Sequence, residues 1–453
     1  MENEEVVRRI VSLSEKAGAS QAEVFAATTR ISSIYIDDSV PKIADAKIEF
    51  GIGLKFVLGK RIGFTSSTLL SESPEDVVQR AGSVARVSNE DPKFVSLPEA
   101  KTPSGKKDRF LDKRTANADA SELLDCAMRV VDSAISDKVS VPNGVLRAST
   151  IDFMVQNSLG VRASSMSTMV FGFFTAKSDD AGLVGEGVQR CWSRKLSTID
   201  FAALGQRLKS QALSSLRAKA FKDSWTDIVG VLAPSECSEM LGQLVGLAAS
   251  AENMNNRSSP WTDRLGDRVA HENLTIQDNG LSETGMLSSV IDDEGTPSQK
   301  TVLIDKGELK SYFFDSYNAS LGSLRSTGNG IRRDPRECLG RFSLPATCGL
   351  TTLEIRPGRQ SLDDIVGQTK KGVYIEHLAW PQIDPMSGTF SNEVRSASLI
   401  ENGEITDQVK HALLVGNLYE SLKREISLSS QTEVHNNCVI PTVAFPGLEL
   451  VGQ

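Results

Sequence analysis

Apolar residues recur with helical spacing near the start of the chain and again before residue 90. The first stretch ends at Gly18, a residue that favours the turn after a helix. The second follows Ser73-Pro74 and two acidic residues, a common helix start. Between them, apolar and polar positions alternate over residues 48–58, and residues 59–61 turn the chain into another apolar strand. The pattern predicts a helix, a β-hairpin with one buried face, and a second helix.

The same order of elements recurs after a polar linker around residues 91–117, which is rich in Pro and Lys. The elements predicted are a capped helix from Asp119, strands over 145–155 and 161–175, and a helix over about 200–220. We therefore interpret residues 1–223 as an N-terminal α+β domain. Its two related halves, about 1–90 and 118–223, each have the order helix, β-meander, helix.

The remaining residues, 224–453, carry stronger strand signals. A short apolar strand over 228–233 leads into a helix that starts at Pro234. Two segments, 304–309 and 400–405, share a hairpin pattern, and the second contains the Asn-Gly pair that favours a type I′ turn. We expect a β-rich, antiparallel C-terminal domain and an α+β fold overall. A doubly wound nucleotide-binding sheet is disfavoured because no long βαβ series occurs.

Composition narrows the class of protein. The 453 residues suggest two or three domains at about 150 residues each. Fifty Lys and Arg stand against 58 Asp and Glu, so the chain is acidic and lacks the basic surface that nucleic acids require. No apolar run approaches the roughly 18 residues of a membrane span, and the first residues are acidic. We expect a cytoplasmic protein with no nucleic-acid or membrane partner.

Standard catalytic signatures do not occur in the chain. The sequence contains no GxSxG, Walker, GxGxxG or HExxH motif. No two of the four histidines lie four residues apart, the spacing that would place both on one helix face for zinc. The six cysteines form no CxxC pair and are interpreted as free thiols.

Three weaker candidates remain. His435 and Cys438 could share one metal ion, but two ligands do not make a site, and the alternative is a polar loop with an incidental cysteine. His377, at the end of an apolar strand, is either a general base or a partly buried histidine satisfied by backbone groups. Residues 326–330 could form a backbone nest for an anion or a substrate carboxylate, or only a loop.

Several short segments, taken in order, resemble one family. They are Gly51-Ile52-Gly53-Leu54, residues 61–64, 326–329, 361–365, 372–375, 384–391, 400–405, 416–418 and 446–452. Together they resemble the TldD/PmbA family, the modulator of DNA gyrase family, which is a metallopeptidase system. The resemblance spans nearly the whole chain.

The resemblance also indicates a branch of that family. In the zinc-bearing branch, a strand ending in Leu-Ala-Pro precedes a helix that carries HExxxH, and a cysteine near the C-terminus is the third ligand. Here the strand matches at residues 231–234, but Gly242, Gln243 and Leu247 stand at the HExxxH positions. Gly and Leu cannot bind zinc, and Gln cannot act as a base. The chain therefore resembles the PmbA/TldE branch, with no cofactor of its own and zinc in a TldD-type partner.

The resemblance implies a subunit that assists proteolysis of unfolded or small peptides, as a dimer with a zinc-bearing TldD-like paralogue or with itself. It leaves open whether this chain is itself an enzyme, and no catalytic residue is assigned. The alternatives are a homodimeric peptide-binding protein without a partner and a regulator of DNA gyrase. Extended peptides are expected to contact two loops, through Thr327, Gly328, Asn329, Asp384, Ser387 and Gly388.

Overall fold

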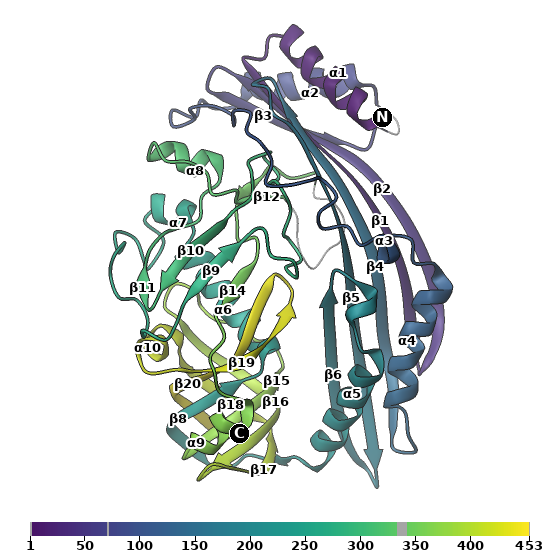
Figure 1. The fold of residues 1–453 in the computed structure, drawn as a ribbon, viewed down its shortest axis with the longest axis vertical. Helices are drawn as coiled ribbons and strands as arrows, with labels where there is room; N and C mark the ends of the chain where they lie inside the picture. The colour runs from purple at the N-terminus through teal and green to yellow at the C-terminus, as the bar shows by residue number, and fades with distance from the viewer. Residues whose placement is uncertain (1, 70–71, 333–341, 453) are drawn as a thin grey trace.

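Two β-sheets face each other in the computed structural model, which describes residues 2–69, 72–332 and 342–452 (Figure 1). The first sheet consists of β1 (Gln21–Asp37), β2 (Val40–Leu58), β3 (Arg61–Ser67), β4 (Val139–Asn157), β5 (Arg162–Asp180) and β6 (Leu183–Ser193). Its order is β3-β2-β1-β4-β5-β6, and every neighbouring pair is antiparallel. The two predicted meanders therefore join through β1 and β4 into one sheet.

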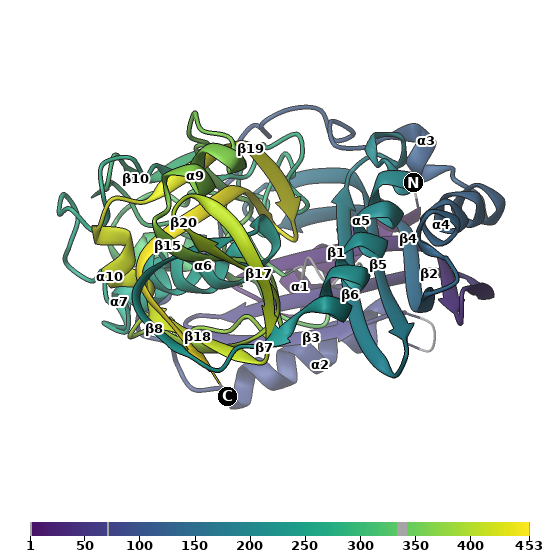
Figure 2. The same ribbon diagram turned by 90° about the horizontal axis from the view of Figure 1, so that it is seen from below.

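Helices cover one face of this sheet. They are α1 (Glu2–Lys16), α2 (Pro74–Val87), the short α3 (Lys113–Ala116), α4 (Ala120–Ala134) and α5 (Phe201–Arg217). α1 and α2 lie over one end of the strands, and α4 and α5 lie over the other (Figures 1 and 2). Ser73 and Asp76 form a capping box at the start of α2, as the sequence predicts. Both helix, meander, helix units are thereby confirmed.

Two strand predictions were incomplete. The sequence pattern did not indicate β1, because this strand is buried on both faces and so lacks the alternation of a one-sided strand. The predicted buried face over 48–58 is wrong at Ile48, whose side chain is 69% exposed. The apolar side chains packed under α1 and α2 begin only at Phe50.

The second sheet has twelve strands and carries most of the C-terminal half. They are β7 (Lys219–Ala220), β8 (Ser224–Leu232), β9 (Ile276–Asn279), β10 (Lys300–Asp305), β11 (Glu308–Leu309), β14 (Leu353–Ile355), β15 (Lys371–Leu378), β16 (Thr389–Glu401), β17 (Glu404–Lys410), β18 (Ala412–Asn417), β19 (Ser427–His435) and β20 (Cys438–Gly452). The main order is β11-β10-β9-β14-β20-β8-β15-β16-β17-β7, with β18 and β19 attached to β20. β12 (Gly330–Ile331) and β13 (Thr347–Cys348) form a separate small ladder.

Helices α6 (Pro234–Ala248), α7 (Ala251–Asn255), α8 (Ser316–Leu321), α9 (Leu362–Gln368) and α10 (Leu418–Lys423) belong to this half, and a 3-10 turn spans Leu196–Thr198. Both predicted hairpins are confirmed, since Ile304 pairs with Leu309 and Ile400 pairs with Ile405. The sheet is mainly antiparallel but contains parallel pairs such as β8 with β15. An α+β fold with a β-rich C-terminal domain is therefore confirmed.

Buried arginines connect the two halves. Arg332 Nη2 donates to Glu23 Oε1 of β1 at 2.6 Å, and both side chains are fully buried. Arg194 donates to the carbonyl oxygens of Gly285 and Ser288. The predicted boundary at 223/224 stays a prediction, and β7 before it already pairs with β17 of the second sheet.

Five cysteines in the described ranges are free thiols, and Cys338 lies outside those ranges. In the same ranges, we find no helix with the length and apolar character needed to cross a bilayer.

Candidate functional site

A cleft separates the helix-free face of β5 and β6 from the C-terminal half, and it is the best candidate for a binding site. It consists of two adjoining hollows of about 420 and 220 Å³. Both hollows are lined by Val188, Arg190, Ser235, His377 and His435. Strands β5 and β6 form one wall, which α5 extends in the smaller hollow through Arg207, Ser210 and Gln211. Helix α6 and the ends of β15 and β19 form the other wall.

Aromatic side chains dominate the first wall. Phe171 and Trp192 are opposite each other in the β5–β6 register, with ring centroids 4.4 Å apart. Phe173 is opposite Arg190, whose guanidinium lies 5.5 Å from the ring centroid. Such a surface offers flat apolar area and a cation held by an aromatic face.

Polar residues of α6 form the second wall. Ser235, Ser238, Glu239 and Gln243 line the larger hollow, and their spacing places them on one side of the helix. The opposite side of α6 is part of the hydrophobic core, through Met240, Leu241, Leu244, Val245 and Ala248. The helix is therefore anchored by its apolar side and presents its polar side to the cleft.

His377 lies at the bottom of this wall, beside a buried carboxylate. Its Nδ1 is 3.6 Å from Glu236 Oε1. Glu236 also accepts hydrogen bonds from the Leu378 backbone N–H and the Ser235 hydroxyl, both at 3.0 Å. The polar group beside the histidine ring is thus a side-chain carboxylate, whereas the sequence analysis considered backbone groups. The sequence could not show this, because residues 236 and 377 meet only through the packing of α6 on β15.

His435 and Cys438 face each other in the β19–β20 hairpin but have separate partners. His435 Nε2 lies 3.0 Å from Glu433 Oε2, and this contact lowers the pKa of the Glu433 carboxyl. Cys438 is buried against α6, with Sγ 3.7 Å from the Ser238 carbonyl oxygen. Burial raises the pKa of its thiol to about 12, so the thiol is protonated at neutral pH.

Zinc does not fit the residues at this place. A Cβ atom on Gly242 would lie 3.5 Å from Cys438 Sγ, so the position at which the resemblance expects the first zinc ligand lies beside this cysteine. Yet Gly242 has no donor, and the Gln243 amide donates to the Glu239 and Pro381 carbonyl oxygens. In the described part of the chain, no three His, Cys, Asp or Glu side chains are grouped as metal ligands.

The predicted peptide contacts Thr327, Gly328 and Asn329 lie in a buried network outside the cleft. Asn329 Nδ2 donates to Asp278 Oδ2 at 2.6 Å and to the Gly349 carbonyl oxygen at 2.9 Å. Thr327 Oγ1 donates to Asn329 Oδ1 at 2.6 Å. Burial raises the pKa of Asp278 to about 6. These contacts join three chain segments, and a role in peptide binding stays a prediction.

The other predicted contacts, Asp384, Ser387 and Gly388, lie in the loop between β15 and β16, where Asp384 and Ser387 are exposed and Gly388 is buried. The Ser387 hydroxyl donates to Asp384 Oδ2 at 2.7 Å and lowers the pKa of that carboxyl. Gly388 has a φ of 76°, a conformation that favours glycine. Asp384 borders a shallow hollow that shares Trp380 with the cleft, whereas the 327–329 segment does not line it. The structure therefore does not bring the two predicted sets together.

Sequence reasoning missed the exposed Trp380 and the aromatic wall. Trp380 is 78% exposed and lies at the edge of the cleft, between the end of β15 and the 384–388 loop. An exposed tryptophan beside a cleft is typical of a binding surface. The Trp-Pro pair directly after an apolar strand was the only available signal.

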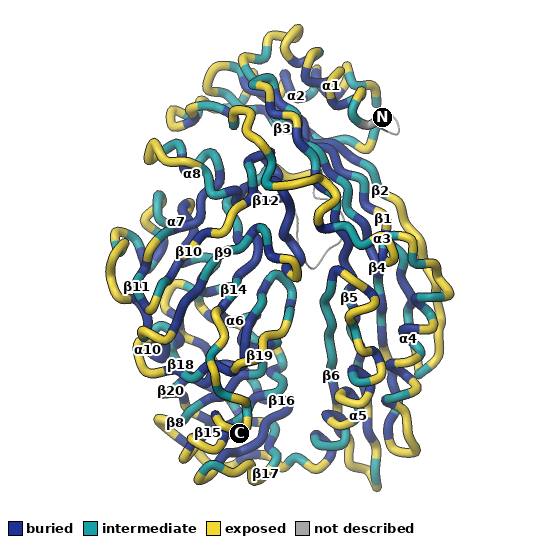
Figure 3. Tube along the Cα trace, viewed as in Figure 1, coloured by how far each residue is buried: buried dark blue, intermediate teal, exposed yellow. Residues whose placement is uncertain are grey.

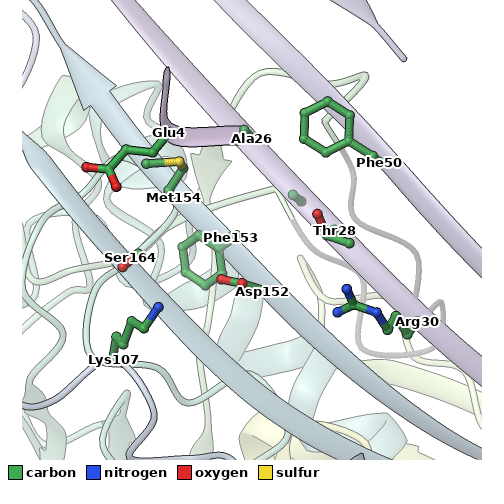
Figure 4. Close-up of a pocket in the computed structure, with 11 residues that line it drawn as sticks. Glu4, Ala26, Thr28, Arg30, Phe50, Lys107, Asp152, Phe153, Met154 and Ser164 are labelled. Carbon is green, nitrogen blue, oxygen red and sulfur yellow. The ribbon is translucent and has the colours of Figure 1, made fainter. Parts of the chain in front are cut away.

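A second groove lies on the helix-covered face of the first sheet (Figure 4). It measures about 460 Å³ and is lined by residues of several strands and by Glu4 of α1. Asp152 of β4 lies in it between Arg30 and Lys107. Partial burial raises the pKa of this carboxyl, and the two cations oppose that rise. The groove is on the opposite face of the sheet from the cleft.

Comparison with known proteins identifies the class. Residues 228–452 match the PmbA/TldA metallopeptidase C-terminal domain, residues 22–85 match domain 1, and residues 107–216 match the central domain. The chain therefore belongs to the PmbA/TldD family of metallopeptidase-type proteins.

Individual relatives support the family and the fold. The protein MJ0231 of Methanocaldococcus jannaschii is 26% identical over 97% of this chain and 99% of its own length. The metalloprotease TldD homolog of Haemophilus influenzae is 33% identical over 49% of this chain and 45% of its own length. The crystal structure of TldE from Thermococcus kodakarensis has a TM-score of 0.89 at 21% identity, covering 99% of this chain and all of that one. At this identity, the similarity to TldE concerns the fold.

Proposed function

We propose that this chain is the PmbA/TldE-like subunit of a TldD/PmbA metallopeptidase system and assists a zinc-bearing TldD-type partner in cleaving unfolded or small peptides. The observation that carries the proposal is the position of Gly242 and Gln243. The resemblance places both at the motif positions. Gly242 lies next to Cys438, Gln243 lines the cleft, and neither offers a zinc ligand or a base. The metalloprotease names of the relatives and the TldE fold are consistent with it.

The chain's own residues would contribute binding rather than bond cleavage. The Gln243 amide holds the Pro381 carbonyl and so fixes the loop that carries Trp380. Trp380 and the Phe171–Trp192 wall offer apolar contacts for peptide side chains, and Arg190 offers a cation for a carboxylate. Contacts of this kind accept many sequences, as an unspecific peptidase requires.

Mixing tests the proposal. This chain is combined with a relative that carries HExxxH, and hydrolysis of an unstructured peptide is followed by chromatography. The mixture should cleave several-fold faster than the relative alone, and chelation should abolish the activity of the mixture. Chelator-sensitive cleavage by this chain alone would contradict the proposal.

A pair of variants tests whether the cleft is responsible. Trp380→Ala should reduce the gain on mixing, because it removes an exposed apolar contact at the cleft edge. Val87→Ala, at the end of α2 and 83% exposed, is the matched control and should retain the gain. Ser387→Ala tests the predicted peptide contact in the neighbouring loop in the same assay.

A homodimeric peptide-binding protein without a partner is the second candidate. It is favoured by one observation: the aromatic rings of Phe171 and Trp192 and the cation of Arg190 line the cleft, and these are binding groups that need no metal ion. Two results together would favour this candidate: the chain alone binds a fluorescent unstructured peptide, and adding the chain to an HExxxH-bearing relative does not increase peptide hydrolysis.

A further inference from the structure

One edge of the first sheet is open along half of β2. β2 pairs with β1 over its whole length, but on its other side β3 reaches only residues 52–58. No other strand or bridge among the described residues covers positions 40–51 on that side. The exposed stretch along β2 is visible in Figure 3. It includes the apolar side chains Val40, Ile43 and Ile48, which are 48, 58 and 69% exposed. Such an edge can pair with a further strand.

The second half of the same sheet shows how an equivalent edge is covered. β5 occupies the place of β2 in that half, and β6 covers only its residues 170–180. An extended segment runs beside the remainder of β5. The Met166 N–H donates to the Lys107 carbonyl at 2.6 Å, and the Thr168 N–H donates to the Phe110 carbonyl at 3.1 Å. In the described residues, β2 has no corresponding segment.

We propose that the open edge of β2 pairs with the same edge of a second copy of this chain, antiparallel about a two-fold axis through Ala46. An axis perpendicular to the sheet keeps each face continuous, so odd residues oppose odd and even oppose even. The two longest such overlaps are centred on Asp45 and on Ala46. The first sets Asp45 against itself, whereas the second sets Asp45 opposite Lys47 of the second copy, twice.

The charged side chains at odd-numbered positions of β2 favour pairing with a second copy of the chain. Asp45 makes no ion pair in the described part of the chain, and Lys47 only approaches Glu49 at 3.9 Å, an exposed pair of little energetic weight. On the other side of the strand, Ala44 is set opposite Ile48, an apolar contact. The inference goes beyond the proposed function, since β2 contributes no residue to the cleft.

Charge reversal tests the register. Asp45→Lys and Lys47→Asp should each weaken self-association by about tenfold or more, because each replaces two attractive cross-strand pairs by two repulsive ones. Mixing the two variants should restore association, since the new lysine at position 45 of one copy then meets the new aspartate at position 47 of the other. The double variant Asp45→Lys/Lys47→Asp should also associate like the original chain. Lys42→Asp, on the same strand but opposite an uncharged residue, is the control. Sedimentation equilibrium over a concentration series measures the dissociation constants, and thermal melting verifies folding.

Several results would overturn the proposal. These are a chain that stays monomeric at every concentration, self-association unchanged in both single variants, and single variants that do not recover on mixing. An Asp45→Lys variant that self-associates normally but loses its effect on the zinc-bearing relative would show that the edge binds that relative instead. Loss of self-association with an intact gain in peptide hydrolysis would confirm this interface and leave the proposed function standing, so the two hypotheses fail separately.

Discussion

At the residue scale, the sequence predicted which residues stand at the motif positions but not what surrounds them. Counting from the matched strand at 231–234 placed Gly242 at the first motif position, and the structure sets that glycine beside Cys438. The contact joins a helix and a hairpin almost 200 residues apart, so local patterns cannot reveal it. The predicted contact Asn329 shows the opposite case, because its burial depends on Asp278 and Gly349 from distant segments.

The first prediction concerns Cys438. Purified protein should contain far less than one zinc per chain, and Cys438→Ser should leave the metal content unchanged, because a tight zinc site takes three or four ligands. The thiol should react with a disulfide reagent only after denaturant is added, since it is buried and its pKa lies near 12. Elemental analysis and thiol titration are the measurements. Nearly one zinc per chain, lost in Cys438→Ser, would contradict the branch assignment.

A second prediction at this scale concerns Asp315, the N-cap of α8. Its Oδ1 accepts hydrogen bonds from the backbone and side-chain nitrogens of Asn318, both at 2.8 Å. Burial, followed by repulsion from Glu294, raises its pKa to about 6. An unfolded Asp ionises near pH 3.9, so between about pH 4 and 6 the folded state retains a proton that the unfolded state has lost. Stability due to this group therefore falls as pH rises through that range.

Asp315→Asn keeps the cap and removes the charge. The variant should be more stable than the original chain at pH 8, by about 1 to 3 kcal/mol, and equally stable near pH 4. Urea unfolding at four pH values between 4 and 8 measures the difference. Asp119→Asn, which alters the exposed cap of α4, is the control and should show no such trend. A difference that is the same at every pH would refute the assignment.

At the scale of elements, periodicity was a reliable guide wherever one face meets water. The capped helices and both Gly-containing hairpins followed from local patterns. The doubly buried β1 did not, and neither did the end of burial at Ile48, because both depend on what lies above the strand. Local sequence patterns likewise do not show where two helices come into close contact.

Gly205 marks such an approach, between α5 and α4. A Cβ atom there would overlap the Val130 carbonyl oxygen and crowd Ser133. Gly205→Ala should therefore destabilise the protein by about 1 to 3 kcal/mol, although alanine favours helices. Gly367→Ala in α9 is the control, because nothing lies within 4 Å of the added atom, and it should be neutral or stabilising. Guanidinium unfolding compares the two, and equal effects would count against close packing at Gly205.

At the scale of the whole molecule, the cleft exists because two separately predictable halves face each other. The sequence predicted a helix-bearing sheet and a β-rich partner, but their relative placement rests on long-range contacts such as Arg332 with Glu23. The aromatic wall on β5 and β6 and the polar side of α6 become one site only through that placement.

The ion pair between Glu23 and Arg332 should therefore dominate the coupling of the two halves. Arg332 also lies 5.1 Å from the Phe25 ring centroid and donates to the Leu344 carbonyl. Removing the Glu23 carboxylate leaves this buried guanidinium without its ion-pair partner, and Lys55, 3.8 Å from Glu23 Oε1, loses the same partner. Glu23→Ala should lower the free energy of unfolding by about 3 to 5 kcal/mol. The double variant Glu23→Gln/Arg332→Met should lower it by less than the sum of the losses in its two single variants. Asp407→Ala, which breaks an exposed pair with Lys219, should cost under about 1 kcal/mol. Chemical unfolding of the complete double-mutant cycle gives the coupling. Additive effects at positions 23 and 332 would mean that packing between the sheets, and not this pair, holds the cleft together.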